Sequence, residues 1–354
     1  MFSLFKKIKK HLSSFFVNRR IKQYKYIHIM FNDKFNSPFV KFLNKEFNNE
    51  EHLILCKRFF KEFPFPKGKN VVEIDSLKGL DFSCTNKIIC HSLFDSELVD
   101  YLYSHRELLT QKAYWVVWGG DLYNATRNKK NDWVRSNFRG YLLFADKDSD
   151  ILKSKYENIL HENFHSIEYP LCLDITKIKS TLKKNDEIII QINNSCDKTT
   201  LEMLDVLAKY KNENIKIVTV LSYGDLKYKA DIIHKGTELY GDNFSYFDNY
   251  VSPEEYARHI ANIDIFIANQ NRQQATANID MCLFFNTKVF IRSEISTYDM
   301  YQKMGYCVYD TNEIKKLSYD DFIYKLDNDN TKLARYYISN EYRKKLWETC
   351  FNEK

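Results

Sequence analysis

The sequence predicts an α/β fold with two doubly wound, Rossmann-like domains facing a cleft. The chain has 354 residues, which is too long for one small core and fits two domains of ordinary size. Hydrophobic residues make up 44% of it, enough to fill two cores. Short apolar runs alternate with segments of helical spacing, and this alternation stops in a polar stretch at residues 171–186 and then restarts.

The first domain is expected at residues 23–175. Its predicted strands are 24–31, 52–56, 70–74, 87–92 and 113–119, and its predicted helices are 38–48 and 95–108. Asp95 can cap the second helix with its side chain, and Glu97 lies in the first turn, where an acidic residue is favourable.

The second domain is expected at residues 186–335, followed by a C-terminal helix at 336–354. Its predicted strands are 186–192, 215–224, 263–269 and 287–291, and its predicted helices are 199–210, 252–263 and 273–285. Ser252, Pro253 and Glu255 form a helix start with a capping box. No Gly-x-Gly-x-x-Gly or Walker sequence occurs, which argues against dehydrogenases and P-loop enzymes.

Charge and cysteine usage limit the function further. The net charge of +6 suits a phosphate-bearing ligand or an anionic membrane and is too small to indicate nucleic acid. The eight cysteines include no Cys-x-x-Cys pair and no metal spacing, so we expect reduced thiols in the cytoplasm, no metal site and no cofactor. No apolar run reaches the ~20 residues that cross a bilayer, and we expect no signal peptide.

Residues 1–22 have the pattern of a basic amphipathic helix. Apolar residues at helical spacing form one stripe, at Phe2, Leu4, Phe5, Ile8, Leu12, Phe15 and Phe16. Basic residues flank or follow it, at Lys6, Lys7, Lys9, Lys10, Arg19, Arg20 and Lys22. Such a helix can lie on an anionic membrane surface or pack against the protein's own core, and the sequence favours neither.

Polar residues follow several predicted strands. In parallel sheets, ligands bind beyond the carboxyl ends of the strands. Five such ends are polar: Cys90–Ser92, Trp118–Asp121, Asn193–Ser195, Ser222–Asp225 and Ala268–Gln274.

The ends in the second domain suit a phosphate. A predicted helix begins at Gln273, Gln274 and Thr276. A helix N-terminus attracts an anion, and Arg272 adds a full positive charge at the same place. Asn194 and Ser195 follow a strand, where short side chains can donate to phosphate oxygens. For each site alone, turn and cap chemistry is the favoured explanation, so the phosphate hypothesis depends on the coincidence of several such sites in one domain.

The first domain offers two candidates for a general base. Asp121 follows Gly119 and Gly120, which permit close backbone approach, and a carboxylate there could deprotonate an acceptor hydroxyl. His91 is the rival base. The simpler interpretations are a helix cap or Asx-turn for Asp121 and a hydrogen-bonded strand-end histidine for His91.

These residues together resemble the TDP-N-acetylfucosamine:lipid II N-acetylfucosaminyltransferase family, which adds the third sugar in enterobacterial common antigen assembly. The resemblance covers roughly residues 85–310. It depends on Trp118–Tyr123 (WGGDLY), Asn194-Ser195 with Asp197, Tyr223-Gly224, Tyr256–Asp264 and Arg272-Gln273-Gln274.

The resemblance implies a two-domain glycosyltransferase of the GT-B type that is inverting and metal-independent. The second domain would bind a nucleotide-diphosphate deoxyamino sugar, with Tyr223 and Gly224 on the donor side. The first domain would bind a polyprenyl-diphosphate-linked glycan, with Gly119, Gly120 and Tyr123 on the acceptor side and Asp121 favoured as base. The enzyme would be cytoplasmic and peripheral on the inner face of the plasma membrane.

The chain departs from the family pattern at two places near the donor. Asn193 stands where the family has glycine, and residues 199–202 (TTLE) replace Ser-Asn-x-His. Two alternatives therefore stay open. One is a glycosyltransferase for another envelope glycan, such as lipopolysaccharide, capsule or teichoic acid. The other is a non-catalytic two-domain protein that binds a sugar or nucleotide.

Overall fold

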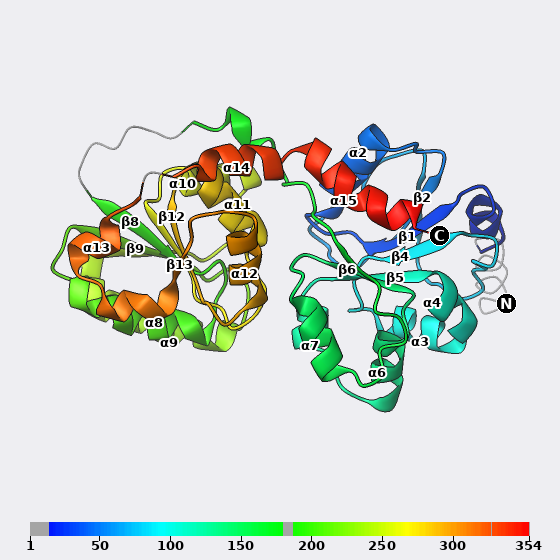
Figure 1. Ribbon diagram of the computed structural model, residues 1–354, viewed down its shortest axis with the longest axis horizontal. Coiled ribbons are helices and arrows are strands. Elements are labelled where there is room, and N and C mark those ends of the chain that lie inside the picture. The colour runs from blue at the N-terminus through cyan, green and yellow to red at the C-terminus, as the bar shows by residue number, and fades with distance from the viewer. Residues whose placement is uncertain (1–13, 180–186, 327, 354) are drawn as a thin grey trace, which may run out of the picture. The chain divides into compact units, whose positions relative to one another are not determined.

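The computed structural model describes residues 14–179, 187–326 and 328–353. The chain forms two compact units, each built around a parallel sheet (Figure 1). Unit 1 is Met1–Cys172 with Asn340–Lys354, and unit 2 is Leu173–Ser339. The predicted α/β class with two Rossmann-like units is confirmed. The first division, after Cys172, lies close to the expected limit at 175. The C-terminal segment, expected as a separate helix at 336–354, joins the first unit from Asn340.

Unit 1 contains a seven-stranded parallel sheet in the order β3-β2-β1-β4-β5-β6-β7. Its strands are β1 Tyr26–Phe31, β2 His52–Lys57, β3 Val71–Ile74, β4 Lys87–Cys90, β5 Ala113–Val117, β6 Gly140–Leu143 and β7 Phe164–Ser166. Its helices are α2 Asn36–Glu46, α3 Ser96–Ser104, α4 Arg106–Lys112, α5 Gly120–Tyr123, α6 Lys129–Ser136, α7 Asp148–Lys155 and α15 Asn340–Asn352. Residues 14–21 are also helical, and the rest of the expected amphipathic helix, residues 1–13, lies outside the described residues.

Alternation along the strands gives this sheet two buried faces. Ile27 and Ile29 of β1 belong to a core with side chains of α3, α6 and α7. Met30 belongs to the opposite core, which side chains of α2 and α15 complete. Helices therefore cover both faces, and the central strands β4, β5 and β6 are buried along their whole length, as expected for a parallel sheet covered on both faces.

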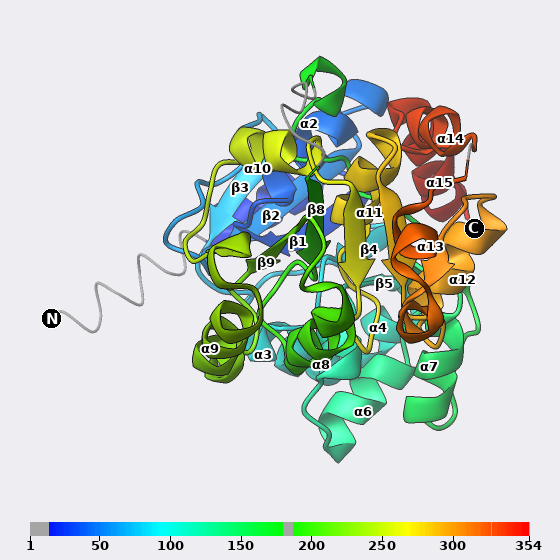
Figure 2. The same ribbon diagram turned by 90° about the vertical axis from the view of Figure 1, so that its left-hand side faces the viewer.

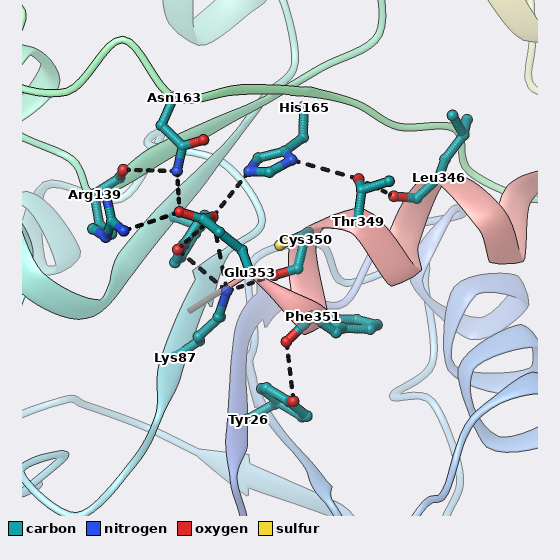
Figure 3. Close-up of polar contacts among 11 residues, drawn as sticks. Tyr26, Lys87, Arg139, Asn163, His165, Leu346, Thr349, Cys350, Phe351 and Glu353 are labelled. Atoms are coloured by element: carbon teal, nitrogen blue, oxygen red, sulfur yellow. Dashed lines mark hydrogen bonds and ion pairs between the residues drawn. The ribbon is translucent and has the colours of Figure 1, made fainter.

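The C-terminal helix α15 follows unit 2 in sequence but completes unit 1. Its side chains Trp347, Cys350 and Phe351 are buried in the core beneath α2. Figure 3 shows Glu353, just after the helix, among polar partners on unit 1. Its carboxylate accepts from Asn163 at 2.6 Å and from Tyr114 at 2.7 Å.

The same carboxylate forms ion pairs with Arg139 and Lys87 and contacts His165. Burial alone would raise the pKa of Glu353, but the hydrogen bonds and the charge of Lys87 outweigh it and hold the pKa below its usual range. The carboxylate therefore stays ionised and anchors the end of the chain to β4, β5 and β7.

Unit 2 contains a six-stranded parallel sheet in the order β10-β9-β8-β11-β12-β13. Its strands are β8 Ile188–Ile192, β9 Ile215–Val220, β10 Phe244–Phe247, β11 Ile265–Ala268, β12 Lys288–Ile291 and β13 Tyr309–Asp310. Its helices are α8 Lys198–Leu207, α9 Lys229–Tyr240, α10 Pro253–Ile260, α11 Thr276–Phe284, α12 Ser296–Lys303, α13 Tyr319–Ile323 and α14 Asn330–Tyr337. Figure 2 shows α8 and α9 on one side of this sheet and α10 on the other.

Local signals in the sequence explain several helix ends. Asp95 accepts from the Glu97 backbone N–H and begins α3, and Ser252 accepts from the Glu255 N–H and begins α10, as predicted. The expected helix 95–108 is instead two helices that meet at His105. The expected helix 273–285 begins only at Thr276, because Ala275 before it is left-handed.

The strand order reverses once in each sheet. In unit 1 the chain builds β1, β2 and β3 outward in one direction and then places β4 on the other side of β1. In unit 2 it likewise places β11 beside β8 after β9 and β10. Ligands in open α/β sheets bind outside the carboxyl ends of the strands at such a reversal. We call these places the unit 1 switch point (β1/β4) and the unit 2 switch point (β8/β11).

Candidate functional site

The unit 2 switch point carries a cluster of amide and hydroxyl side chains. We call it the amide cluster; it consists of Asn194, Ser195, Tyr223, Gln270 and Gln274. Gln270 and Gln274 donate to Asn194 Oδ1 at 2.9 and 3.1 Å. Gln274 also donates to Ser195 Oγ at 2.7 Å, and Asn194 donates to the Tyr223 hydroxyl at 3.0 Å. The ends of β8, β9 and β11 are thus joined through side chains.

The amide cluster combines buried and accessible groups. Asn194, Ser195 and Gln270 are buried. Gln270 Oε1 has no hydrogen-bond partner among the described residues, although a buried polar atom normally has one. Tyr223 exposes 43% of its surface, yet desolvation of its hydroxyl raises its pKa to about 12, against the opposing effects of Arg272 and Asn194. The cluster therefore has polar capacity that its internal bonds do not use.

Helix α11 begins beside this cluster. Its N-cap residue, Ala275, makes no side-chain hydrogen bond to the first turn and has φ 65°. An uncapped N-terminus presents backbone N–H groups and a partial positive charge. The structure thus joins Gln274 and Thr276 at one helix start. Arg272 lies close enough to affect the Tyr223 pKa, and it donates to the Gln273 carbonyl at 3.0 Å.

The Tyr223-Gly224 turn is held against the end of β8. Cys196 N–H donates to the Tyr223 carbonyl, and Asp225 N–H donates to the Cys196 carbonyl, both at 2.8 Å. Gly224 has φ 104°, and a Cβ there would lie 2.4 Å from the Cys196 carbonyl oxygen. Only glycine fits this turn, which fixes Tyr223 over Asn194.

Asn193 has a structural role under the cluster. Its φ is 53°, a conformation that glycine adopts freely and asparagine tolerates. Its side chain donates to the hydroxyls of Thr199 and Thr200 and accepts from the Asn269 N–H at 2.8 Å. The glycine expected from the resemblance and the asparagine found here therefore meet the same backbone requirement, and Thr199 and Thr200 support this turn from α8.

The structure does not give Asp121 the position that the sequence predicted for a general base. Its side chain is 1% exposed. Oδ2 accepts from Leu93 N–H at 2.9 Å and from Trp115 Nε1 at 2.8 Å, and Oδ1 accepts from Trp118 N–H at 2.9 Å. Burial raises its pKa, which those hydrogen bonds only partly oppose. The carboxylate closes the turn after β5, so we correct the expectation that it faces an acceptor.

His91 is also engaged inside the unit. It is 4% exposed, and burial lowers its pKa to about 3. Its Nε2 pairs with His28 Nδ1 at 2.8 Å, and its Nδ1 pairs with the Tyr169 hydroxyl. His28 Nε2 in turn pairs with His52 Nδ1 at 3.1 Å. With both ring nitrogens occupied, His91 has none left for an acceptor hydroxyl, and this second expectation is corrected as well.

Gly119, Gly120 and Tyr123, which were predicted on the acceptor side, are sequence neighbours of Asp121. Gly119 has φ 72°, and a Cβ on Gly120 would lie 3.0 Å from the Phe94 ring, so both glycines shape the turn. Tyr123 donates to Asp148 Oδ1 at 2.7 Å and is partly buried. Through these contacts the three residues stabilise the turn after β5.

Two features of the switch points were not predicted from the sequence. Gln270 lies within the predicted polar strand end Ala268–Gln274, but only the structure places its side chain on Asn194. Asp33 lies two residues beyond the end of β1, at the unit 1 switch point, in the sequence FNDKF. The polar run after a predicted strand was the signal that could have found it.

Two negative findings concern the described residues. No group of three or more His, Cys, Asp or Glu side chains among them is arranged to hold a metal ion. No helix within the described ranges has the length and apolar character needed to cross a bilayer.

Comparisons with known proteins bear on the fold. No protein-family model matches the chain, and no curated protein sequence matches it significantly. Among solved structures, HepE from Anabaena, in complex with UDP and glucose, has a TM-score of 0.65 at 10% identity, over 93% of this chain and 100% of that chain. The lipopolysaccharide outer core galactosyltransferase WaaB has a TM-score of 0.64 at 10% identity, over 92% and 99%.

A third similar structure is the sucrose-phosphate synthase of Thermosynechococcus elongatus, with a TM-score of 0.61 at 8% identity, over 92% of this chain and 98% of that chain. At such low identity the likeness shows the fold alone. The chain therefore has the two Rossmann-like units found in GT-B glycosyltransferases.

Proposed function

We propose that the chain is a glycosyltransferase that moves a sugar from a nucleotide-diphosphate donor to a glycan of the bacterial envelope. The observation that carries this proposal is the amide cluster beside the uncapped start of α11, at the unit 2 switch point. HepE, similar in fold, was solved with UDP and glucose, and WaaB is a galactosyltransferase by its description. These likenesses support the reaction class without identifying the sugar.

The donor diphosphate would lie at the start of α11. Backbone N–H groups there, together with Gln274, Ser195 and Asn194, are donors suited to phosphate oxygens. Arg272 would add a full positive charge. Such fixed donors stabilise the charge that develops on a leaving nucleotide diphosphate, which makes a metal-independent reaction chemically reasonable.

The finer parts of the proposal come from the sequence resemblance. They are inversion at the anomeric carbon, a deoxyamino sugar like N-acetylfucosamine in the donor, and a polyprenyl-diphosphate-linked glycan as acceptor. A lipid-linked acceptor also gives a reason for the basic segment at residues 1–22, whose described part exposes Phe15 and Phe16. On this proposal the enzyme works at the inner face of the plasma membrane.

A glycosyltransferase for another envelope glycan is the second candidate. WaaB, which acts on lipopolysaccharide by its description, favours it. Nucleotide release from a panel of UDP- and TDP-sugars separates the two candidates by their preferred donor. Tight nucleotide binding with no release from any donor in the panel would instead favour a non-catalytic binding protein.

Donor binding tests the placement directly. Titration calorimetry with UDP and TDP should show a dissociation constant ~10–100-fold higher in Gln274→Ala and in Arg272→Ala, because each loses a hydrogen bond or charge toward the diphosphate. Gln302→Ala, an exposed glutamine on α12 of the same unit, should bind like the wild type. Unchanged affinity in both cluster variants, with folding intact, would remove the diphosphate from this place.

A further inference from the structure

The unit 1 switch point carries a carboxylate that no proposed step yet uses. Asp33 lies two residues beyond the end of β1, which pairs with β4 at the reversal of strand order. Asp95, the next acid after β4, is occupied, because it forms an ion pair with Lys57 at 2.6 Å and caps α3. Asp33 is therefore the acid that the topology brings to the place where ligands of such sheets bind.

One oxygen of Asp33 is fixed and the other is available. Oδ1 accepts from the backbone N–H groups of Phe35 and Asn36, at 2.8 and 2.9 Å, where α2 begins. Oδ2 accepts no hydrogen bond from any described residue. Asp121 differs, because both of its oxygens are occupied. Asp33 is held in one orientation by its backbone contacts and retains an oxygen that can take a proton.

The neighbouring residue makes this loop rigid. Asn32 is fully buried, and its Nδ2 donates to the carbonyls of Phe60 and Phe63 at 2.5 and 2.6 Å. Its Oδ1 accepts from the Phe59 N–H at 2.6 Å. The loops after β1 and β2 are thereby joined, and a reactive group carried on a rigid element keeps its geometry through a reaction.

The surroundings of Asp33 are apolar and aromatic. Phe35 packs on Trp118 with ring centroids 5.1 Å apart, and Trp118 packs on Tyr169 at 4.8 Å. Burial raises the pKa of Asp33 to about 6, against the two backbone hydrogen bonds and Lys34, which lower it. A base whose pKa lies near the working pH transfers a proton efficiently.

The titratable groups around Asp33 come from three elements. Lys34 is on the same loop as Asp33, Cys56 is on β2, and Tyr169 and Cys172 belong to the segment after β7. Burial raises the pKa of Cys56 to about 12 and that of Tyr169 well above its usual value. Both groups are therefore neutral near pH 6, and the nearby charge is that of Lys34.

We infer that Asp33 is the catalytic base of the proposed transfer, a step that rests on the proposed function. Oδ2 takes the proton of the acceptor hydroxyl as that oxygen forms its bond to the anomeric carbon of the donor sugar. The bond from that carbon to the phosphate oxygen breaks at the same time, and the nucleotide diphosphate leaves with the electron pair. Asp33 ends protonated and later releases the proton to solvent.

Asp33→Asn tests this assignment without removing the backbone contacts. The amide oxygen of asparagine can still accept from Phe35 and Asn36, so the variant should fold with an unchanged melting temperature and unchanged affinity for UDP and TDP. Its rate of nucleotide release from the best UDP- or TDP-sugar of the panel should fall ~100-fold or more, the usual contribution of a general base. Asp33→Ser, which also keeps a capping oxygen, serves as the second variant if the first is unstable.

Asp81→Asn is the matched control. Asp81 is an exposed acid of the same unit whose carboxylate also accepts from a loop N–H, that of Ser83 at 2.9 Å. The rate of nucleotide release by Asp81→Asn should equal that of the wild type. Below about pH 6, where Asp33 becomes protonated, the wild-type kcat/KM should fall about tenfold per pH unit, and Asp33→Asn should lack this dependence.

These experiments distinguish a failure of the Asp33 assignment from a failure of the proposed function. If Asp33→Asn releases nucleotide at nearly the wild-type rate, Asp33 is not the base, while the proposed glycosyltransferase function stands. Proton NMR showing that the released sugar keeps its anomeric configuration would lead to the same conclusion. If the wild type binds UDP or TDP but releases nucleotide from no donor in the panel, the proposed function fails and the base fails with it.

Discussion

A carboxylate serves as a base when an acceptor hydroxyl can reach one of its oxygens. Asp121 and Asp33 both follow strands of the unit 1 sheet, but their environments differ. Three donors hold both oxygens of Asp121 inside the β5 turn, whereas two donors hold only one oxygen of Asp33. One aspartate, Asp121, therefore closes a turn at the end of its strand, and the other, Asp33, keeps an oxygen that can take a proton. Sequence spacing located Asp121 but could not show which way its carboxylate points.

Asp121→Asn should destabilise the fold. The amide nitrogen would face N–H donors of Leu93 and Trp115 or of Trp118, leaving buried donors unpaired at a cost of about 2–4 kcal/mol in the free energy of unfolding. Urea denaturation measures this loss, and Asp100→Asn on an exposed side chain is the control. Wild-type stability together with lost nucleotide release would contradict the structural role and restore Asp121 as a base.

At the scale of elements, strained backbone marks the ends of two strands and the start of one helix. Ser92 after β4, Asn193 after β8 and Ala275 before α11 have positive φ angles. Residues other than glycine in this region cost of order 1–3 kcal/mol and concentrate at functional sites. The strain at Ala275 has a visible consequence, because it starts α11 directly after Gln274 with an N-cap residue that makes no side-chain hydrogen bond to the first turn.

Helix 14–21 offers a test of membrane association. Phe15 and Phe16 are 64% and 60% exposed, while Val17 and Ile21 are buried against unit 1. Phe15→Ser with Phe16→Ser should lower binding to phosphatidylglycerol-containing vesicles at least ~10-fold, because each aromatic ring contributes apolar area to the interface. Leu226→Ser, an exposed apolar residue of unit 2, should have no effect in the same co-sedimentation assay. Equal binding of both variants would show that these rings do not contact the membrane.

At the scale of the whole molecule, the fold class followed from alternation and length. Polar residues after apolar runs also located most of the amide cluster, because parallel strands bring such ends to one edge. The return of α15 to unit 1 could not be predicted, since helical spacing shows which side of a helix is apolar but not which sheet it covers. Sequence also could not give the strand order, and without it the special position of Asp33 beside β4 was not visible.

The central claim is that the unit 2 switch point holds the donor diphosphate. A structure of the chain with UDP or TDP bound tests it most directly. We predict the diphosphate within hydrogen-bond distance of Ser195, Gln274 and the first N–H groups of α11. A nucleotide bound elsewhere on the chain, with the amide cluster unchanged, would contradict the account.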